Sequence, residues 1–191
     1  MIKRLASLLA AFVLAAPLAL AQTSTWVPDK AHSEVGFSIL HMSLAKVSGR
    51  FGNIGGTVAL NDADITKSTI NVTIDVNTVD TGVDSRDSDL KGDHFFDVAQ
   101  FPTAAFVSTG ISKSGDGLTV SGNLTLHGVT KPLTLEVEKP TGPLTAMGKT
   151  HMGFSATTTL KRTDFGIGTK YPSTMIGDDV KLTIDLDLTK Q

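Results

Sequence analysis

The chain has 191 residues, with 17 Lys and Arg against 19 Asp and Glu, a formal net charge of −2 and no cysteine. Its residues are 40% hydrophobic and 19% charged, which is typical of one ordinary folded domain and not of a disordered, collagenous or multidomain protein. The lack of cysteine excludes disulfides, thiol catalysis and thiolate metal sites.

The N-terminal segment has the pattern of an export signal. Lys3 and Arg4 precede an apolar stretch that ends in the cleavage motif Ala19-Leu20-Ala21. The stretch is too short to cross a bilayer, and no stop-transfer charges follow it. We therefore expect a cleaved signal peptide over residues 1–21 and a single periplasmic domain over residues 22–191. Removing the two basic residues lowers the net charge to about −4, and no basic stripe remains to bind nucleic acid.

Alternation of apolar and polar residues dominates the rest of the chain. Around residue 72, for example, Ile70, Val72, Ile74 and Val76 take the even positions and polar residues take the odd ones, as in a strand with one buried face. The pattern predicts strands, in chain order, near residues 35–39, 51–60, 70–76, 104–111, 118–126, 133–137, 152–160 and 180–188. Because short turn segments separate them, we expect about eight antiparallel strands in an up-and-down barrel or a sandwich.

One segment, residues 84–96, breaks this pattern. Asp84 can act as a helix N-cap, and further acidic residues follow it in the first turn. We therefore predict a short helix near residues 84–92, with Phe95 and Phe96 packed beneath it.

The charged clusters do not form a recognisable catalytic set. The carboxylates beside Arg86 are explained by a solvated helix start with an internal ion pair, and Arg162 by a salt bridge at a strand end. The chain contains no Gly-x-Ser-x-Gly motif, and no Ser, His and Asp that the strand pattern would bring together. We therefore predict no catalytic residues.

The five histidines raise the question of a metal site. On one straight strand, His32 and His41 would lie about 30 Å apart, too far to share an ion. The pairs His41-Met42 and His151-Met152 have donors that suit copper, but two dipeptides do not define a site. We predict no metal and no cofactor.

The apolar strand faces have to be buried, either as a filled core or around a ligand. A closed eight-stranded barrel has room for side chains or for one small ligand. Its expected lining is Val, Leu, Ile and Phe, which suits a hydrocarbon chain better than a sugar or a base. An outer-membrane barrel would need aromatic girdles at both interfaces, and Trp26 and Tyr171 cannot supply two.

A set of short motifs, taken in order, resembles one known family. The motifs are Trp26-x-x-Asp29-x-x-His32-Ser33, Gly49-Arg50-Phe51, Val79-Asp80-Thr81, Arg86-Asp87-x-x-Leu90, Phe95-Phe96-Asp97, Phe101-Pro102, Gly122-Asn123-Leu124-Thr125-Leu126 and Asp164-Phe165-Gly166. Over residues 25–189 the chain is similar to the YceI family of bacterial polyisoprenoid-binding proteins. The resemblance implies an extended lipocalin-like antiparallel β-barrel in the periplasm, whose long apolar pore holds a lipid. The chain departs from the common family pattern at Asp89, where a histidine is usual.

The resemblance and the apolar strand faces together predict the residues that line the pore: Val35, Phe37, Ile39, Phe51, Ile74, Phe106, Leu124, Phe154, Ile184 and Leu186. The expected partner is a long-chain isoprenoid or another apolar lipid, and not nucleic acid. We expect a binding protein that is not an integral membrane protein, present as a monomer or a homodimer. The alternative is an enzyme or metal protein that acts on such a lipid through its His, Asp and Arg residues.

Overall fold

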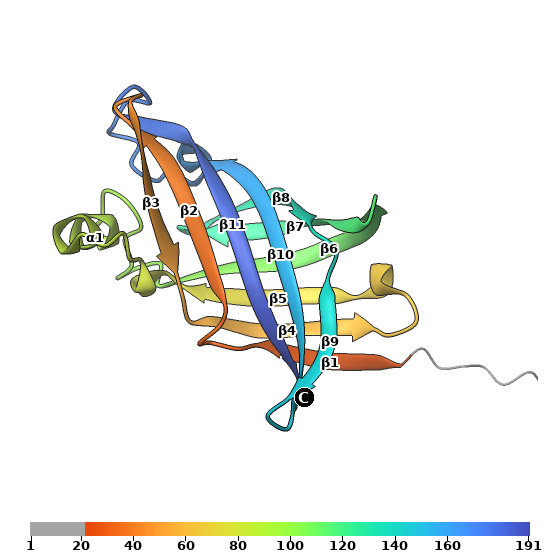
Figure 1. The fold of residues 1–191 in the computed structure, drawn as a ribbon. Coiled ribbons are helices and arrows are strands. Elements are labelled where there is room, and N and C mark those ends of the chain that lie inside the picture. The colour runs from red at the N-terminus through yellow and green to blue at the C-terminus, as the bar shows by residue number, and fades with distance from the viewer. Residues whose placement is uncertain (1–21) are drawn as a thin grey trace, which may run out of the picture.

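The computed structural model describes residues 22–191, and the signal peptide expected over residues 1–21 lies outside them. The strands form one antiparallel sheet of 11 strands, of which eight close into a barrel because β11 pairs with both β1 and β10 (Figure 1). Around the barrel, the eight strands are β11 (Ile176–Lys190), β1 (Thr23–Pro28), β4 (Ile54–Asn61), β5 (Thr69–Asp75), β6 (Thr103–Ser114), β7 (Gly117–Leu126), β8 (Val129–Val137) and β10 (Lys149–Lys161). The predicted fold class, an extended antiparallel eight-stranded barrel with one short helix, is confirmed.

Three further strands lie outside the closed ring: β2 (Glu34–His41), β3 (Ala45–Phe51) and β9 (Thr141–Ala146). Strand β11 accommodates two neighbours on one edge because it is 15 residues long. Its first part pairs with β2, whereas its last residues pair with β1. The β2–β3 hairpin therefore continues the barrel wall beyond the end of β1.

The structure corrects the predicted strand inventory. We expected residues 35–39 to be a barrel strand, but they belong to the flanking hairpin, and β1 takes the place in the ring. Strands β1, β3 and β9 were not predicted. In β9 the reason is local, because Gly142 and Pro143 are residues that normally indicate a turn.

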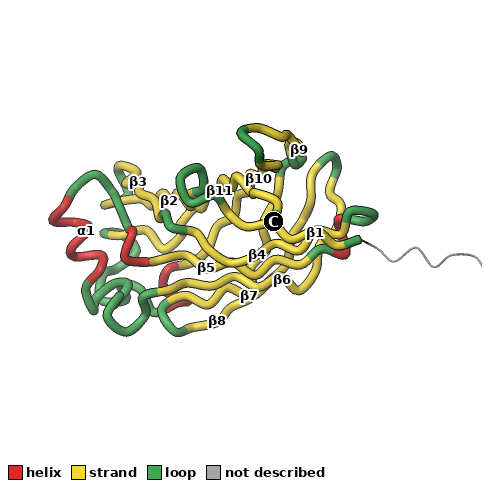
Figure 2. The backbone as a smooth tube through the Cα atoms, turned by 90° about the horizontal axis from the view of Figure 1, so that it is seen from below, coloured by secondary structure: helices red, strands yellow, loops and turns green. Residues whose placement is uncertain are grey.

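The short helix is present as α1 (Asp84–Lys91), at one end of the barrel (Figure 2). Its N-cap is Val83 and not Asp84, so the predicted cap is wrong by one residue. The first turn is instead fixed by Asp87, whose Oδ1 accepts hydrogen bonds from N and Oγ1 of Thr81 at 2.9 and 2.5 Å. Among residues 22–191, no helix is both long enough and apolar enough to cross a membrane. Single 3₁₀ turns occur at η1 (Ile65–Lys67), η2 (Val76–Thr78) and η3 (Arg162–Phe165).

Close-packed side chains fill the barrel where β1 closes it. Trp26, Val58 and Leu188 are almost completely buried there, as is Val120 on the facing strand β7. Trp26 satisfies its indole N–H by donating to Ser24 Oγ at 2.8 Å. These side chains leave only a small apolar space of about 110 Å³ between them, and a more open space lies elsewhere in the barrel.

Candidate ligand-binding site

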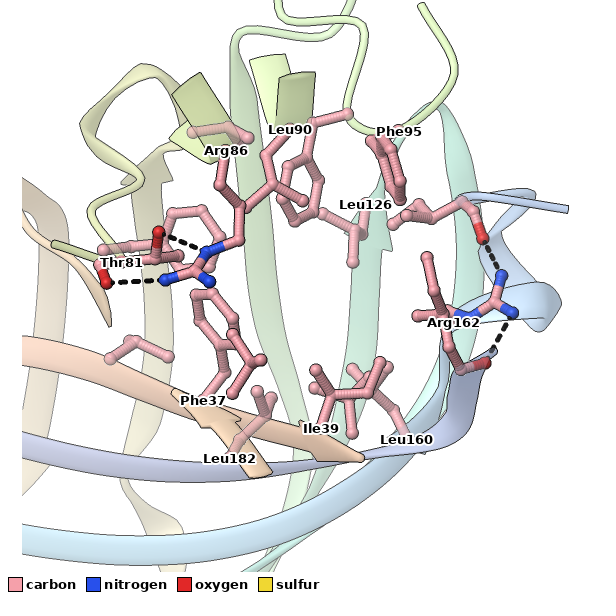
Figure 3. A pocket seen from close by; sticks show the side chains of 18 of the residues that line it. Phe37, Ile39, Thr81, Arg86, Leu90, Phe95, Leu126, Leu160, Arg162 and Leu182 are labelled. Atoms are coloured by element: carbon pink, nitrogen blue, oxygen red, sulfur yellow. Dashed lines mark hydrogen bonds between the residues drawn. The ribbon is translucent and has the colours of Figure 1, made fainter. Parts of the chain in front are cut away.

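A cavity of about 470 Å³ lies between the β2–β3 hairpin, the barrel strands and α1. Its volume falls within the range of small-molecule sites, roughly 300 to 1,000 Å³. Most of the lining is aliphatic or aromatic and comes from strands, from α1 and from the segments between them, including Phe37 and Ile39 of β2, Leu126 of β7, Leu160 of β10 and Leu182 of β11 (Figure 3). We call this space the upper cavity.

Side chains alternate between the two faces of β2, and this alternation explains how the hairpin contributes to the lining. Val35, Phe37 and Ile39 are on one face of the strand, and all three line the upper cavity. Phe37 pairs with Gly49 of β3 in the strand register. A Cβ at Gly49 would lie 2.5 Å from Cζ of Phe37 and 2.7 Å from Cγ2 of Thr81, so only glycine leaves room for this ring.

Aromatic rings join the hairpin to the segment that follows α1. Phe51 lies 5.4 Å from Phe37 and 5.4 Å from Phe96, measured between ring centroids, and Phe95 stacks on Tyr171 at 5.3 Å. All five residues line the upper cavity. We expected Phe95 and Phe96 to pack beneath the helix. In the structure their rings connect the segment after the helix to β3 and to the loop before β11.

Arg86 of α1 provides a cationic group at the edge of the upper cavity. Its Nε donates to Thr81 Oγ1 at 2.8 Å and its Nη2 donates to the Thr81 carbonyl at 3.0 Å. Among the described residues it forms no salt bridge, so the predicted ion pair within the helix is wrong. Thr81 binds both side chains instead, because its N and Oγ1 donate to Asp87 while its Oγ1 and carbonyl oxygen accept from Arg86.

Arg162 lies across the cavity from Arg86 and is only 3% exposed (Figure 3). Its guanidinium donates five hydrogen bonds of 2.6 to 3.0 Å, to the carbonyls of Ile167, Gly168, Tyr171, Ile176 and Gly177. The predicted strand-end salt bridge is therefore wrong. Arg162 instead holds the loop between η3 and β11 in place, because each of its donors finds a neutral backbone acceptor.

A second, smaller cavity of about 110 Å³ adjoins the first. Both cavities are lined by Val35, Ile74, Leu124 and Leu182, so these side chains separate the two spaces. The second space, here called the lower cavity, is lined by apolar side chains apart from Ser68. Together the two cavities form an apolar interior that extends along the barrel.

All ten predicted pore residues line this interior. Six line the upper cavity: Val35, Phe37, Ile39, Phe51, Ile74 and Leu124. The other four, Phe106, Phe154, Ile184 and Leu186, line only the lower one. Their role in ligand binding stays a prediction. The predicted set of pore residues did not include Leu90, Phe95, Phe96 and Tyr171, which also line the upper cavity. The motif Phe95-Phe96-Asp97 had marked two of these positions.

The histidines are distributed over different parts of the fold. His41 lines the upper cavity, whereas His32 and His151 line a separate space of about 460 Å³ beside β9. There His151 Nδ1 lies 2.9 Å from Oδ1 of Asp187. His127 is a half-buried turn residue, with Nδ1 2.9 Å from the Phe165 carbonyl oxygen. Within residues 22–191, no three His, Asp or Glu side chains are arranged to hold a metal ion.

Comparisons with known proteins agree with this architecture. Solved structures that resemble it include BcnA of Burkholderia cenocepacia, with a TM-score of 0.76 and 24% identity over 84% of this chain and 98% of that one. The YCEI protein of Campylobacter jejuni is 30% identical, with a TM-score of 0.69, over 85% of this chain and 96% of the other. A polyisoprenoid binding domain from Saccharophagus degradans has the same fold, with a TM-score of 0.63 and 18% identity over 89% of this chain and 100% of that one.

Sequence similarity shows the family directly. Protein YceI of Salmonella newport is 41% identical over 138 residues, which are 72% of either chain. Residues 26–188 match the YceI-like domain. The chain therefore belongs to the YceI-like family.

Proposed function

We propose that this protein is a periplasmic binding protein that carries one long-chain apolar lipid, such as an isoprenoid, in the upper and lower cavities. The observation that carries the proposal is the continuous apolar lining, which extends from the aromatic rim at Phe96 to the lower cavity around Phe106. Burying a hydrocarbon chain in such a lining contributes about 0.8 kcal/mol per methylene. The similarity to a polyisoprenoid binding domain supports this ligand class.

The polar residues are concentrated where a lipid head group would lie. Thr81, Ser85, Arg86 and Asp89 all line the α1 side of the upper cavity, whereas the lower cavity has Ser68 as its single polar lining residue. A ligand with an apolar tail and a polar head therefore fits in one orientation, with its tail in the lower cavity and its head beside α1. Export by the expected signal peptide would place the protein in the periplasm.

A single substitution between the two cavities tests the proposal. Leu124 is 6% exposed and lines both spaces, so Leu124→Trp would obstruct the path from one to the other. The matched control is Asn123→Trp, one residue away on the exposed face of β7. Binding of a long-chain isoprenoid is measured by native mass spectrometry after incubation with the folded variants.

We expect Leu124→Trp to lose the long-chain ligand and Asn123→Trp to retain it. Because overpacking costs about 1 to 3 kcal/mol, the melting temperature of each variant has to be recorded. If folded Leu124→Trp binds the lipid as well as wild type does, the ligand does not pass between the cavities and the proposal is wrong.

A further inference from the structure

Four large apolar side chains are exposed together at the mouth of the upper cavity. Leu40 near the end of β2 is 45% exposed, and Met42 and Leu44 in the β2–β3 turn are 54% and 84% exposed. Met175 in the loop before β11 is 48% exposed. We call this group the mouth tip. Figure 1 shows the turn and the loop side by side at one end of the molecule. Exposed apolar groups of this kind mark sites of contact with a protein or a membrane.

Hydrogen bonds make the mouth tip one unit. Met42 N donates to the Met175 carbonyl at 2.7 Å, and Ser43 Oγ donates to the Thr174 carbonyl at 3.5 Å. The loop that carries Met175 is itself held by Arg162 through the carbonyls of Tyr171 and Ile176. The four side chains are thus supported by the same contacts that shape the cavity.

The mouth tip is continuous with the cavity lining. Leu40 is both exposed and part of the lining, and its neighbours His41 and Ile176 also line the upper cavity. A ligand that moved between the cavity and an apolar environment in contact with the mouth tip would not have to cross water. This continuity favours a partner that is itself a source of lipid.

The backbone holds Met42 where turn chemistry favours other residues. Met42 and Ser43 have φ of 52° and 57°, a left-handed conformation that is normal for Gly and Asn. The turn therefore exposes a large apolar side chain at a position whose backbone conformation favours Gly or Asn.

The two segments that carry the mouth tip contain cations but no carboxylates. Residues 35–50 and 165–177 include no Asp or Glu, and the carboxylates of Asp178 and Asp179, which follow them, pair with Lys161. The two segments do include Lys46 and Lys170. Apolar side chains flanked by cations suit the surface of a bilayer that contains anionic lipids.

We propose that the mouth tip inserts into the surface of a lipid bilayer with anionic head groups, which places the cavity mouth against the membrane for uptake and release of the ligand. The role in uptake and release rests on the proposed function. The membrane contact itself can be measured without the ligand.

The opposite end of the molecule offers a matched control. In the β9–β10 turn, Leu144 and Met147 are 66% and 104% exposed, and Met147 has a left-handed φ of 50° (Figure 1). Neither residue lines the upper or lower cavity. The test variant is Met42→Asn with Leu44→Ser, and the control is Met147→Asn with Leu144→Ser. Asparagine tolerates the left-handed conformation, so both variants should fold.

Binding is measured by sedimentation with vesicles of phosphatidylethanolamine and phosphatidylglycerol. We expect wild type and the β9–β10 control to bind and the mouth-tip variant to lose roughly tenfold in affinity, because binding scales with the apolar area inserted. Binding should also weaken when phosphatidylcholine replaces phosphatidylglycerol or when salt is raised. All three proteins should retain an isoprenoid equally well, because the substituted residues lie outside both cavities.

Three outcomes would overturn the inference: wild type that does not bind vesicles, equal binding by all three proteins, or loss of binding only in the β9–β10 control. A wild-type dimer that the mouth-tip substitutions dissociate, without any vesicle binding, would assign the tip to a second copy of the chain instead. If vesicle binding behaves as expected but no protein retains a lipid, the proposed function fails while the membrane contact stands.

Discussion

The ring of Phe51 packs against the ring of Phe96 in a T-shaped arrangement, with centroids 5.4 Å apart. Phe51 belongs to β3, and Phe96 lies in the segment that follows α1, so this contact connects the flanking hairpin to the helix at the cavity rim. Because both rings line the cavity, the strength of the contact should influence how fast a ligand leaves.

The Phe96→Ala variant should release a bound lipid faster than wild type, because the helix segment loses its aromatic contact with the hairpin. The free energy of unfolding should fall by about 1 to 3 kcal/mol, less than for a fully buried Phe. Stopped-flow measurement of ligand dissociation and a urea titration test the two effects. Val107→Ala, on an exposed position of β6, is the control. Equal dissociation rates for Phe96→Ala and wild type would show that the rim does not control release.

The Gly49→Ala variant should force the Phe37 ring out of its position, since the new methyl group would lie 2.5 Å from Cζ. We expect weaker lipid binding and a loss of about 1 to 3 kcal/mol in stability. Gly52→Ala is a close control because a Cβ at Gly52 would meet no atom within 4 Å. If the two variants bind and unfold alike, the packing of Gly49 against Phe37 does not shape the cavity.

Arg162→Lys should lower the free energy of unfolding by about 2 to 4 kcal/mol. A lysine has three donors on one nitrogen and cannot reach the carbonyls that the guanidinium joins, which leaves buried acceptors unsatisfied. Amide hydrogen exchange should become faster in residues 166–177. Arg50→Lys provides the comparison, because Arg50 forms exposed ion pairs with Glu34 and Asp80 and should cost less than about 1 kcal/mol. Similar losses in the two variants would contradict the role given to Arg162.

Stability should depend on the ionisation of Asp178. Burial raises the pKa of this carboxyl, but hydrogen bonds from Oγ1 and N of Thr163 and the charge of Lys161 outweigh burial and hold the pKa below its usual value. A carboxyl whose pKa is lower in the folded state stabilises the fold above its unfolded pKa of about 3.9, and this stability is lost as the pH falls through the folded pKa. Urea titrations should therefore show a loss below about pH 4 that is smaller in Asp178→Asn. The same acid dependence in that variant would contradict this assignment.

The interior of the barrel could be predicted because strand periodicity is a local property. Val35, Phe37 and Ile39 alternate with polar residues, and this alternation alone places them on one face of β2. The same reasoning predicted that Ile184 and Leu186 of β11 line the pore, and in the structure both line the lower cavity. The periodicity could not show that β2 lies outside the closed ring, because this depends on how β11 divides its edge between β1 and β2.

The two arginines illustrate why the polar part of the site was harder to predict. Nearby carboxylates suggested ion pairs for both, but backbone carbonyls 5 to 15 residues along the chain bind Arg162. Such acceptors are present at every residue and leave no sequence signal. The mouth tip could not be predicted either, because Met42 and Met175 are 133 positions apart and become neighbours only when β2 and β11 pair.

Native mass spectrometry of the protein recovered from the periplasm of the cells that produce it tests the central claim most directly. The account predicts that each chain carries one long-chain apolar lipid, which organic extraction removes and which ligand-free protein takes up again. Protein that is recovered without any lipid, and that takes up none when incubated with isoprenoids, would contradict it.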